Sequence, residues 1–391
     1  MNDRRADIII VGAGIQGAAL AFHLAGRGAD VLVLERQVPG SGSTRRASGF
    51  IRMHYDLESE ARLAWAAFPW FEHWADMVGT GDCAFVNTGF LQLVPPAYGA
   101  ALRANVGMHQ AVGIDARTVG AADVAALVPG IVIDDIEVAA YEPRSGYADP
   151  SASAVGLMGA ACERGARLEQ GRLVTAISTV GDHISGVDTD AGRYTAPVVV
   201  DAAGTWAGQL AATVGLDIPL RVWRHDTFYL ELPEDRDPHF PIVLDHARQV
   251  YFRPEGGDQV LAGTETANEL GGSPDRAYAR IGPDAIAGLR ERLAARLPWM
   301  VDSPLRSAHG GQDGMTPDQR AIIDRVGPDG LYLLCGFSGS GFKTAPATAL
   351  GMTELILDGA ATSVDISAYR LDRFTRGELL IGEHAYPHLW Q

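Results

Sequence analysis

An α/β fold with two domains is predicted from the order of strands and glycine-rich turns along the chain. Residues 8–11 form a short apolar run, followed by a glycine-rich turn and an apolar helix. The apolar runs at 196–200 and 331–335 also lead into such turns, as parallel strands do when a helix follows. Residues 216–308 look different. Strand-like runs there, followed by a charged helix, predict a second, mostly antiparallel sheet.

The first turn has the pattern of a dinucleotide-binding unit. Gly12, Gly14 and Gly17 give the G-x-G-x-x-G spacing, which permits a tight turn, close approach of a pyrophosphate and close packing of the helix. A second strand, 30–34, ends at Glu35, whose carboxylate can accept hydrogen bonds from ribose hydroxyls and would repel the 2′-phosphate of NADP. The combination predicts a Rossmann-type domain; the alternative is a glycine-rich turn that binds no ligand.

Composition narrows the class of protein. At 391 residues the chain exceeds the usual size of a single core, which favours two domains. The net charge of −16 argues against nucleic acid and anionic membrane surfaces as partners. Three scattered cysteines, without a C-x-x-C or H-E-x-x-H pattern, predict no disulfide framework and no metal site. The apolar stretch 8–26 is explained by the nucleotide motif. We therefore expect a cytoplasmic protein with no stable membrane insertion.

Residues 85–145 read as an excursion from the nucleotide domain. After a Gly/Ser/Pro-rich loop, residues 57–78 predict a helix kinked at Pro69. Beyond it, the pattern predicts a strand at 85–94 with a turn at 87–89, two helical pieces within 101–127, and a strand at 131–141.

The second half starts with a helix signal, Asp149 as N-cap and Pro150 at the first helical position. That helix should end at Gly165. Later expected elements are listed in chain order: strands at 172–179, 183–189, 196–200, 221–232, 250–253 and 259–264, a helix at 283–296, a loop at 310–318, a strand at 331–335 and a helix ending near Leu357.

Taken together, these motifs resemble the FAD-dependent D-amino acid oxidase and sarcosine oxidase superfamily, most closely the sarcosine oxidase-like amine oxidoreductases. The matching segments are 12–17 with Glu35, 42–46, 146–150, 201–206, 315–318 and 336–342. In addition, Ile51-Arg52-Met53-His54-Tyr55 looks like the Ile-Arg-x-x-Tyr segment of sarcosine oxidases, and Gly341-Phe342-Lys343 looks like their Gly-Phe-Lys.

The resemblance implies a Rossmann-type FAD-binding domain with a discontinuous second domain built on a mostly antiparallel sheet. Residues 1–80, 146–215 and 309–391 would form the FAD-binding domain, and residues 81–145 and 216–308 the substrate domain. The implied FAD contacts are Gly12, Gly14, Ile15, Gln16, Gly17, Glu35, Arg36, Ser43, Thr44, Arg45, Ser48, Val174, Ala203, Gly204, Trp206, Gly311, Gly336, Ser338, Gly339, Ser340, Gly341, Phe342 and Lys343.

The chemistry implied by the resemblance is hydride transfer from a carbon next to nitrogen, giving an imine that hydrolyses. Arg52 matches the family's carboxylate-binding arginine, and Lys343 its lysine partner. With Tyr251 these are the expected catalytic residues, and His54 joins them in the substrate-binding set. The expected substrate is a secondary or N-methylated amino acid. A primary amino acid and a 2-hydroxy acid stay open as alternatives.

Three departures from the family pattern carry further expectations. Gly311 stands where some monomeric sarcosine oxidases attach flavin through a cysteine, so we expect noncovalent FAD. Leu261 stands where those enzymes have an oxygen-activating lysine, so the electron acceptor is either O2 or another molecule. Glu265 replaces a histidine of the monomeric type, which can change substrate choice. Other readings stay open: the FAD subunit of a multi-subunit dehydrogenase, a noncatalytic FAD-binding subunit of a larger complex, and a pure NAD-binding protein.

Overall fold

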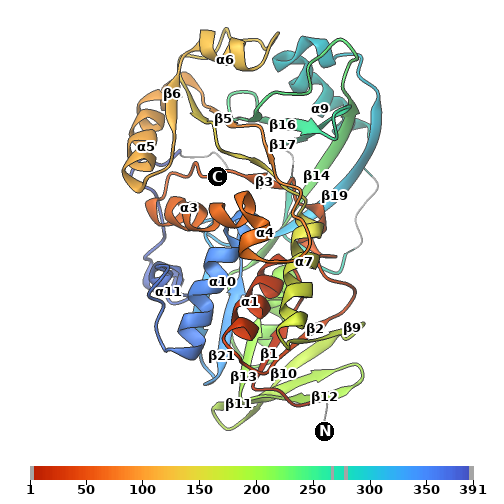
Figure 1. Ribbon diagram of the computed structural model, residues 1–391, viewed down its shortest axis with the longest axis vertical. Coiled ribbons are helices and arrows are strands. Elements are labelled where there is room, and N and C mark those ends of the chain that lie inside the picture. Colours follow the sequence, from red (N-terminus) through yellow and green to blue (C-terminus); the bar gives the residue numbers. More distant parts are fainter. Residues whose placement is uncertain (1–3, 266–267, 277–280, 387–391) are drawn as a thin grey trace.

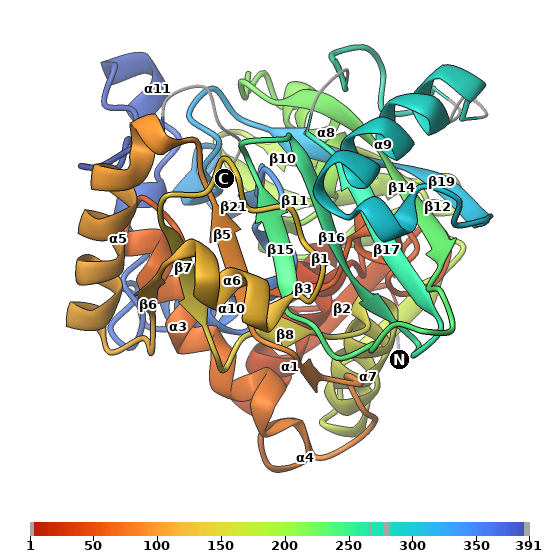
Figure 2. The same cartoon turned by 90° about the horizontal axis from the view of Figure 1, so that it is seen from above.

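Two main sheets are stacked along the long axis of the molecule in the computed structural model (Figure 1). The structure describes residues 4–265, 268–276 and 281–386. Seen from above, strands of the upper sheet cross over the strands and helices of the lower one (Figure 2). We call the lower sheet the Rossmann-type sheet and the upper sheet the large sheet.

The Rossmann-type sheet has the strand order β20-β21-β13-β1-β2-β9. Its strands are β1 (Ile8–Val11), β2 (Val31–Glu35), β9 (Arg167–Gln170), β13 (Val198–Asp201), β20 (Ile322–Val326) and β21 (Leu331–Cys335). Neighbouring strands are parallel except at the β20–β21 edge. This arrangement confirms the predicted α/β fold of Rossmann type.

The two faces of this sheet are covered by different layers. Helices α1 (Ile15–Gly26), α3 (Glu58–Glu72), α7 (Pro150–Glu163) and α10 (Gly341–Leu357) pack beside one another in a single layer. Ile8 and Ile10 belong to the core on this helical side, whereas Ile9 and Val11 belong to a second core. That core is shared with the antiparallel strands β10 (Val174–Val180), β11 (His183–Thr189) and β12 (Gly192–Thr195). Alternating side chains of one strand therefore fill both cores.

The large sheet is mostly antiparallel, as predicted. Its order is β18-β14-β17-β16-β15-β5-β7-β6, with β19 paired to β14, and the β5–β15 pair is parallel. The strands are β5 (Phe90–Leu93), β6 (Arg117–Val119), β7 (Ala139–Glu142), β14 (Arg221–Glu231), β15 (Ile242–Asp245), β16 (Val250–Glu255), β17 (Gln259–Thr264), β18 (Glu269–Leu270) and β19 (Leu305–Met315).

One face of the large sheet is covered by helix α9 (Pro283–Arg296), where Leu289 and Leu293 pack with Phe252 and Val260. A small sheet, β3 (Phe50–Ile51), β8 (Gly146–Tyr147) and β4 (Val86–Asn87), lies between the two main sheets. The shorter helices are α2 (Ser43–Arg46), α4 (Trp74–Met77), α5 (Gly99–Val112), α6 (Ala121–Leu127), α8 (Ala207–Ala212), α11 (Arg373–Arg376) and the 3₁₀ turns η1 (Pro96–Tyr98), η2 (Gly204–Trp206), η3 (Pro298–Met300) and η4 (Ser367–Tyr369).

Several local expectations were wrong. Residues 310–315, expected in a loop, belong to β19. Their glycines make room for side chains of the neighbouring strand β14: a Cβ on Gly311 would lie 2.3 Å from the His225 ring. Residues 131–138 precede β7 instead of forming a strand, and Asp135 there pairs with Arg296 at 2.7 Å. The helix expected over 57–78 is two helices, α3 and α4, separated at His73.

The predicted domain boundaries stay a prediction. Strand β19 runs across the expected boundary at 308/309, since Leu305–Met315 pairs with β14 along its length. Among the described residues, no helix has both the length and the apolar composition that crossing a bilayer requires.

Candidate functional site

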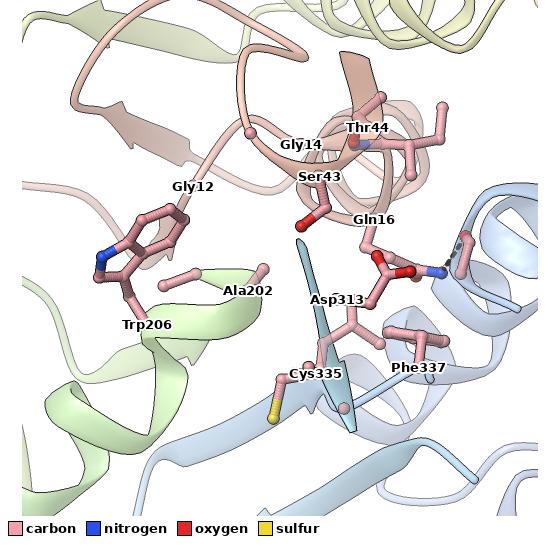
Figure 3. Close-up of a pocket in the computed structure, with 18 of the residues that line it drawn as sticks. Gly12, Gly14, Gln16, Ser43, Thr44, Ala202, Trp206, Asp313, Cys335 and Phe337 are labelled. Carbon is pink, nitrogen blue, oxygen red and sulfur yellow. Dashed lines mark hydrogen bonds between the residues drawn. The ribbon is translucent and has the colours of Figure 1, made fainter. Parts of the chain in front are cut away.

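A cavity of about 450 Å³ lies where the βα turns of the Rossmann-type sheet meet the large sheet. Its walls come from the turns after β1, β2, β13 and β21, from α2, and from β14, β16 and β19. Figure 3 shows Trp206 at one end, Asp313, Gln16 and Phe337 towards the other, and Ser43 between them. The carboxyl ends of parallel strands are where α/β sheets bind their ligands.

Gly12 and Gly17 are required by the close packing of the first turn. Gly12 has a φ of +101°, and a Cβ there would lie 2.7 Å from the carbonyl oxygen of Ala202. A Cβ on Gly17 would lie 2.0 Å from the carbonyl oxygen of Gly12. Helix α1 therefore begins tightly against its strand, with no acidic residue in its first turn. The helix dipole and the amides of this turn favour an anion such as a pyrophosphate.

Glu35 lies at the end of β2, the position expected of a ribose-binding carboxylate. Its Oε2 accepts a hydrogen bond from the Ala13 amide and its Oε1 from the Gln37 amide, both at 2.8 Å. These bonds fix the carboxylate against the first turn. Each oxygen keeps a second lone pair with which it can accept a ribose hydroxyl.

The two ends of the cavity are closed by different contacts. At one end the Arg36 guanidinium lies 3.7 Å from the ring centroid of Trp206, a cation–π contact. At the other end the Gln16 side chain donates to the Gly341 carbonyl oxygen at 2.8 Å, which ties the starts of α1 and α10 together. Ser338, in the turn before α10, has a φ of +51° and accepts a hydrogen bond from the Thr316 amide.

Most of the predicted cofactor residues line this cavity. They are Gly12, Gly14, Ile15, Gln16, Glu35, Arg36, Ser43, Thr44, Ser48, Val174, Ala203, Gly204, Trp206, Gly336, Ser338, Gly339, Gly341 and Phe342. Gly17, Arg45, Gly311, Ser340 and Lys343 do not line it. Gly17 packs under Gly12, Arg45 is exposed, Gly311 is covered by His225, the Ser340 hydroxyl donates to Phe337, and Lys343 lies behind the turn.

His225 and Asp313 are among the cavity residues that sequence reasoning missed. The Nε2 atom of His225 lies 3.6 Å from an Asp313 carboxylate oxygen. Burial raises the pKa of Asp313, and the charges of His225 and Lys343 oppose that shift. The two residues come from β14 and β19, which are paired although they lie far apart in the sequence. No local motif signals them; only the strand pairing brings them together.

Arg52 is buried behind the cavity, with 3% of its surface exposed. Its Nη1 donates to the His54 carbonyl oxygen, and its guanidinium carbon lies 4.5 Å from the Tyr55 ring centroid and 5.6 Å from that of Phe90. Among the described residues Arg52 forms no ion pair with a carboxylate. A guanidinium without a carboxylate partner in the chain can pair with the carboxylate of a ligand.

Lys343 lies beside Arg52. Its Nζ donates to the Gly339 carbonyl oxygen at 3.2 Å and lies 5.8 Å from the Tyr55 ring centroid. Burial and, to a smaller extent, the charge of Arg52 lower the pKa of Lys343 to about 7, whereas Glu60 and Asp313 oppose the shift. Tyr251 lines the cavity and packs edge-on against Phe50 at 5.6 Å. Arg52 and Lys343 therefore lie beside the same ring, that of Tyr55, whereas Tyr251 lines the cavity.

His54 belongs to a buried trio with His109 and Glu142, whose candidate ligand atoms lie within 4.8 Å of one another. His109 Nε2 is bonded to the Tyr55 carbonyl oxygen at 2.7 Å, and Glu142 Oε2 accepts from Ser145 at 2.6 Å. Burial lowers the pKa of His54 well below its ordinary value. The trio is the place to look for a metal, and the expectation of no metal stays a prediction.

The fold and the cavity define a class: two-sheet proteins that bind a dinucleotide at the carboxyl edge of a Rossmann-type sheet, beneath a large antiparallel sheet. Residues 7–355 match the family model described as FAD dependent oxidoreductase, and the chain belongs to this family, DAO. Its cofactor is FAD, and the glycine cradle, the Glu35 carboxylate and the start of α1 fit that dinucleotide.

Several proteins of known activity are similar over nearly the whole chain. The N-methyl-L-tryptophan oxidase of Yersinia pestis is 29% identical over 94% of this chain and 99% of its own. The crystal structure of L-proline dehydrogenase from P. horikoshii is 26% identical with a TM-score of 0.89, over 96% of this chain and 99% of that one. Mouse mitochondrial sarcosine dehydrogenase is 25% identical over 94% of this chain and 41% of its own length.

This chain spans less than half the length of sarcosine dehydrogenase and of the 4-methylaminobutanoate oxidase of Paenarthrobacter nicotinovorans. The glycine oxidase structure from Geobacillus kaustophilus, 23% identical with a TM-score of 0.82, is similar in fold.

Proposed function

We propose that this chain is an FAD-dependent oxidoreductase that takes a hydride from the carbon next to nitrogen of a secondary or N-methylated amino acid. The product is an imine, which water hydrolyses. The substrates named in the most informative relatives, sarcosine, N-methyl-L-tryptophan and L-proline, all carry a secondary amine beside a carboxylate. That shared chemistry supports the proposal.

The observation that carries the proposal is the buried Arg52 without a carboxylate partner among the described residues. A guanidinium binds a carboxylate through two parallel hydrogen bonds and so fixes the orientation of the whole substrate. Lys343, beside it, adds a second positive charge when protonated. An amino acid anchored here by its carboxylate would extend its amine towards the cavity lined by Tyr251 and Phe50.

FAD, when bound, supplies the electron-accepting chemistry, and the protein supplies position and exclusion of water. Tyr251 and Phe50 pack edge-on, and Phe50, Phe90, Leu244 and Leu261 form one apolar cluster on the face of the large sheet above the site. An apolar roof lowers the pKa of a bound ammonium group, because burial disfavours its charged form. The neutral amine is the form from which a hydride can leave.

We also propose noncovalent FAD, O2 or an unidentified electron acceptor as oxidant, a cytoplasmic location and no nucleic-acid partner. The described cysteines Cys83, Cys162 and Cys335 are free thiols, which fits a reducing compartment. Gly311 offers no sulfur for a flavin bond, and the net charge of −16 disfavours nucleic acid.

The decisive experiment is an anaerobic titration of the flavoprotein followed by absorbance. Sarcosine, N-methyl amino acids, L-proline, primary amino acids and 2-hydroxy acids are added in turn. We expect the oxidised flavin bands to bleach with a secondary amino acid, and admission of air then separates an oxidase from a dehydrogenase. Bleaching only by primary amines or hydroxy acids would refute the proposed substrate class and leave the FAD assignment intact.

A further inference from the structure

Glu265, directly after β17, is a buried carboxylate with one oxygen unused. Its side chain is 5% exposed, and its Oε2 is hydrogen-bonded to Nδ1 of the fully buried His246 at 2.8 Å. Within the described residues, Glu265 Oε1 and His246 Nε2 have no hydrogen-bond partner. Buried polar atoms normally have partners, so an unmatched oxygen marks the place of a donor that the protein does not supply.

The backbone places Glu265 beside the ring of Tyr251. Gly263 is paired with Tyr251, and a Cβ on Gly263 would lie 2.2 Å from the Tyr251 hydroxyl oxygen, so the ring covers this glycine. The Glu265 amide donates to the Gln249 carbonyl oxygen at 3.2 Å, which extends the β16–β17 pairing by one residue. Side chains two residues apart on a strand share a face. Glu265 therefore follows Gly263 on the face that Tyr251 covers.

His246 is held on that face from the neighbouring strand. Its amide donates to the Leu93 carbonyl oxygen at 3.0 Å, so the chain stays in the sheet one residue beyond β15. Leu244, two residues earlier, is paired with Tyr251 and packs with it in the apolar cluster above the site. The Glu265 carboxylate is thus fixed by a histidine that the backbone itself positions.

The charges around Glu265 match a zwitterion. Arg52 acts on Glu265 electrostatically, yet the two form no ion pair in the described part of the structure. An amino acid whose carboxylate is held by Arg52 would present its ammonium group to the opposite charge. Burial raises the pKa of Glu265, and Asp245 raises it further; His246 and Arg52 oppose the shift. Other ionisable groups nearby are Tyr251 and, beside His246, His54.

We propose that Glu265 is the proton acceptor for the substrate ammonium group and that His246 is its positioning residue. The N–H bond of the ammonium breaks and an O–H bond forms at Glu265 Oε1. The nitrogen keeps the electron pair, so no oxidation occurs in this step. The freed lone pair is the one that forms the C=N bond when hydride leaves to FAD. This inference rests on the proposed amine oxidation.

The test is the pH dependence of flavin reduction by substrate, measured anaerobically in a stopped-flow instrument. In the wild type we expect the rate to rise with pH and level off once Glu265 is ionised. Glu265→Gln keeps the shape of the side chain, but the amide accepts no proton. We therefore expect flavin reduction to be about 100-fold slower at pH 7. Its rate should then rise about tenfold per pH unit towards the pKa of the free amine, near 10.

Three further variants make the assignment specific. Glu265→Asp keeps a carboxylate and should keep a levelling profile. His246→Leu removes the imidazole N–H that stabilises the carboxylate anion and offers no donor in its place, so the acidic limb should move to higher pH, which a purely structural role would not produce. Glu231→Gln, at a partly exposed residue paired with Arg306 on the large sheet, is the matched control and should match the wild type.

Each outcome decides something. An unchanged pH profile in Glu265→Gln overturns the proposal, and a changed profile in Asp313→Asn instead would assign the proton to Asp313. If Glu265→Gln does not retain FAD, the shift of the acidic limb in His246→Leu decides the question in its place. If wild-type flavin is reduced only by 2-hydroxy acids, the proposed function fails and this assignment fails with it. If only primary amino acids reduce it, the substrate class fails while the Glu265 test still applies.

Discussion

The dinucleotide half of the site and the proposed substrate half are built in different ways. Around Gly12 and Gly336 the walls are backbone turns, each made by a run of consecutive residues. In the proposed substrate half, side chains from strands distant in the sequence interact electrostatically, Glu265 with Arg52 and Asp313 with Lys343. A backbone cradle recognises a phosphate chain common to many proteins. A set of side chains recognises one substrate, and it can change without altering the fold.

The largest effect is expected from removing Arg52, which should lower catalytic efficiency and leave FAD binding unchanged. Arg52→Gln removes the buried guanidinium, and truncating one partner of a buried charge pair costs about 2–5 kcal/mol, so kcat/KM should fall at least about 30-fold. FAD content should not change, because Arg52 does not line the cavity. Steady-state kinetics measure kcat/KM, and the flavin-to-protein absorbance ratio measures the FAD content. Arg62→Gln, which removes an exposed pair with Glu58, is the control. Loss of FAD in Arg52→Gln would show that the halves are not independent.

Substitution of Gly12, in contrast, should weaken FAD binding. Gly12→Ala places a Cβ 2.7 Å from the Ala202 carbonyl oxygen at a φ of +101°. Such backbone strain costs about 1–3 kcal/mol, so FAD affinity should fall about tenfold or more. Fluorescence titration of the apoprotein with FAD measures the change. Gly159→Ala, in α7 where a Cβ meets nothing within 4 Å, should bind FAD normally. If both variants bind FAD equally well, the backbone cradle is not what holds the dinucleotide.

A smaller effect is expected at Gly311, where the two halves meet. A Cβ there would lie 2.3 Å from the His225 ring, and overpacking of this kind costs about 1–3 kcal/mol. Gly311→Ala should therefore displace His225 and weaken FAD binding, part of the strain being relieved by movement of the ring.

In the wild type, acid precipitation should release all the flavin into the supernatant. Flavin that stays with the precipitated protein would refute noncovalent binding.

The sequence predicted the dinucleotide half well because its signals are local. Asp149 and Pro150 mark the start of α7, and the Asp149 carboxylate indeed accepts hydrogen bonds from the Ser151 and Ala152 amides. Gly12 and Glu35 were found from spacing alone and lie together in the cavity. The assignment of their roles to individual FAD atoms stays a prediction, as do the domain boundaries.

The substrate half was predicted less completely because strand pairing decides it. The run Gly310-Gly311-Gln312-Asp313-Gly314 is typical of a loop, yet β14 holds it as a strand and aligns Asp313 with the cavity. Arg52 and Lys343 were predicted from a resemblance, and local spacing does not show that they lie side by side. The His246–Glu265 pair joins the ends of two different strands, so no sequence pattern announces it.

The smallest expected effect is a shift in the pKa of Lys343, which can be measured because the sequence contains no other lysine. Lys343 is the single lysine in the 391 residues, so protein labelled with ε-¹³C lysine gives one side-chain signal. Burial and Arg52 lower the pKa of Lys343 to about 7, against about 10.4 for an exposed lysine. Above pH 7 the free protein therefore holds Lys343 neutral. A bound carboxylate favours the charged form, so the complex must take up a proton.

We expect the ¹³C signal to titrate near pH 7 in the free protein and at higher pH when an inert carboxylate is bound. Calorimetry at pH 8 in two buffers should then show uptake approaching one proton, and carboxylate affinity should fall as pH rises above 7. Arg52→Gln, which removes a neighbouring positive charge, should raise the pKa of Lys343 even without ligand. A ¹³C titration that Arg52→Gln and carboxylate both leave unchanged would mean that Lys343 and Arg52 do not share one anion site.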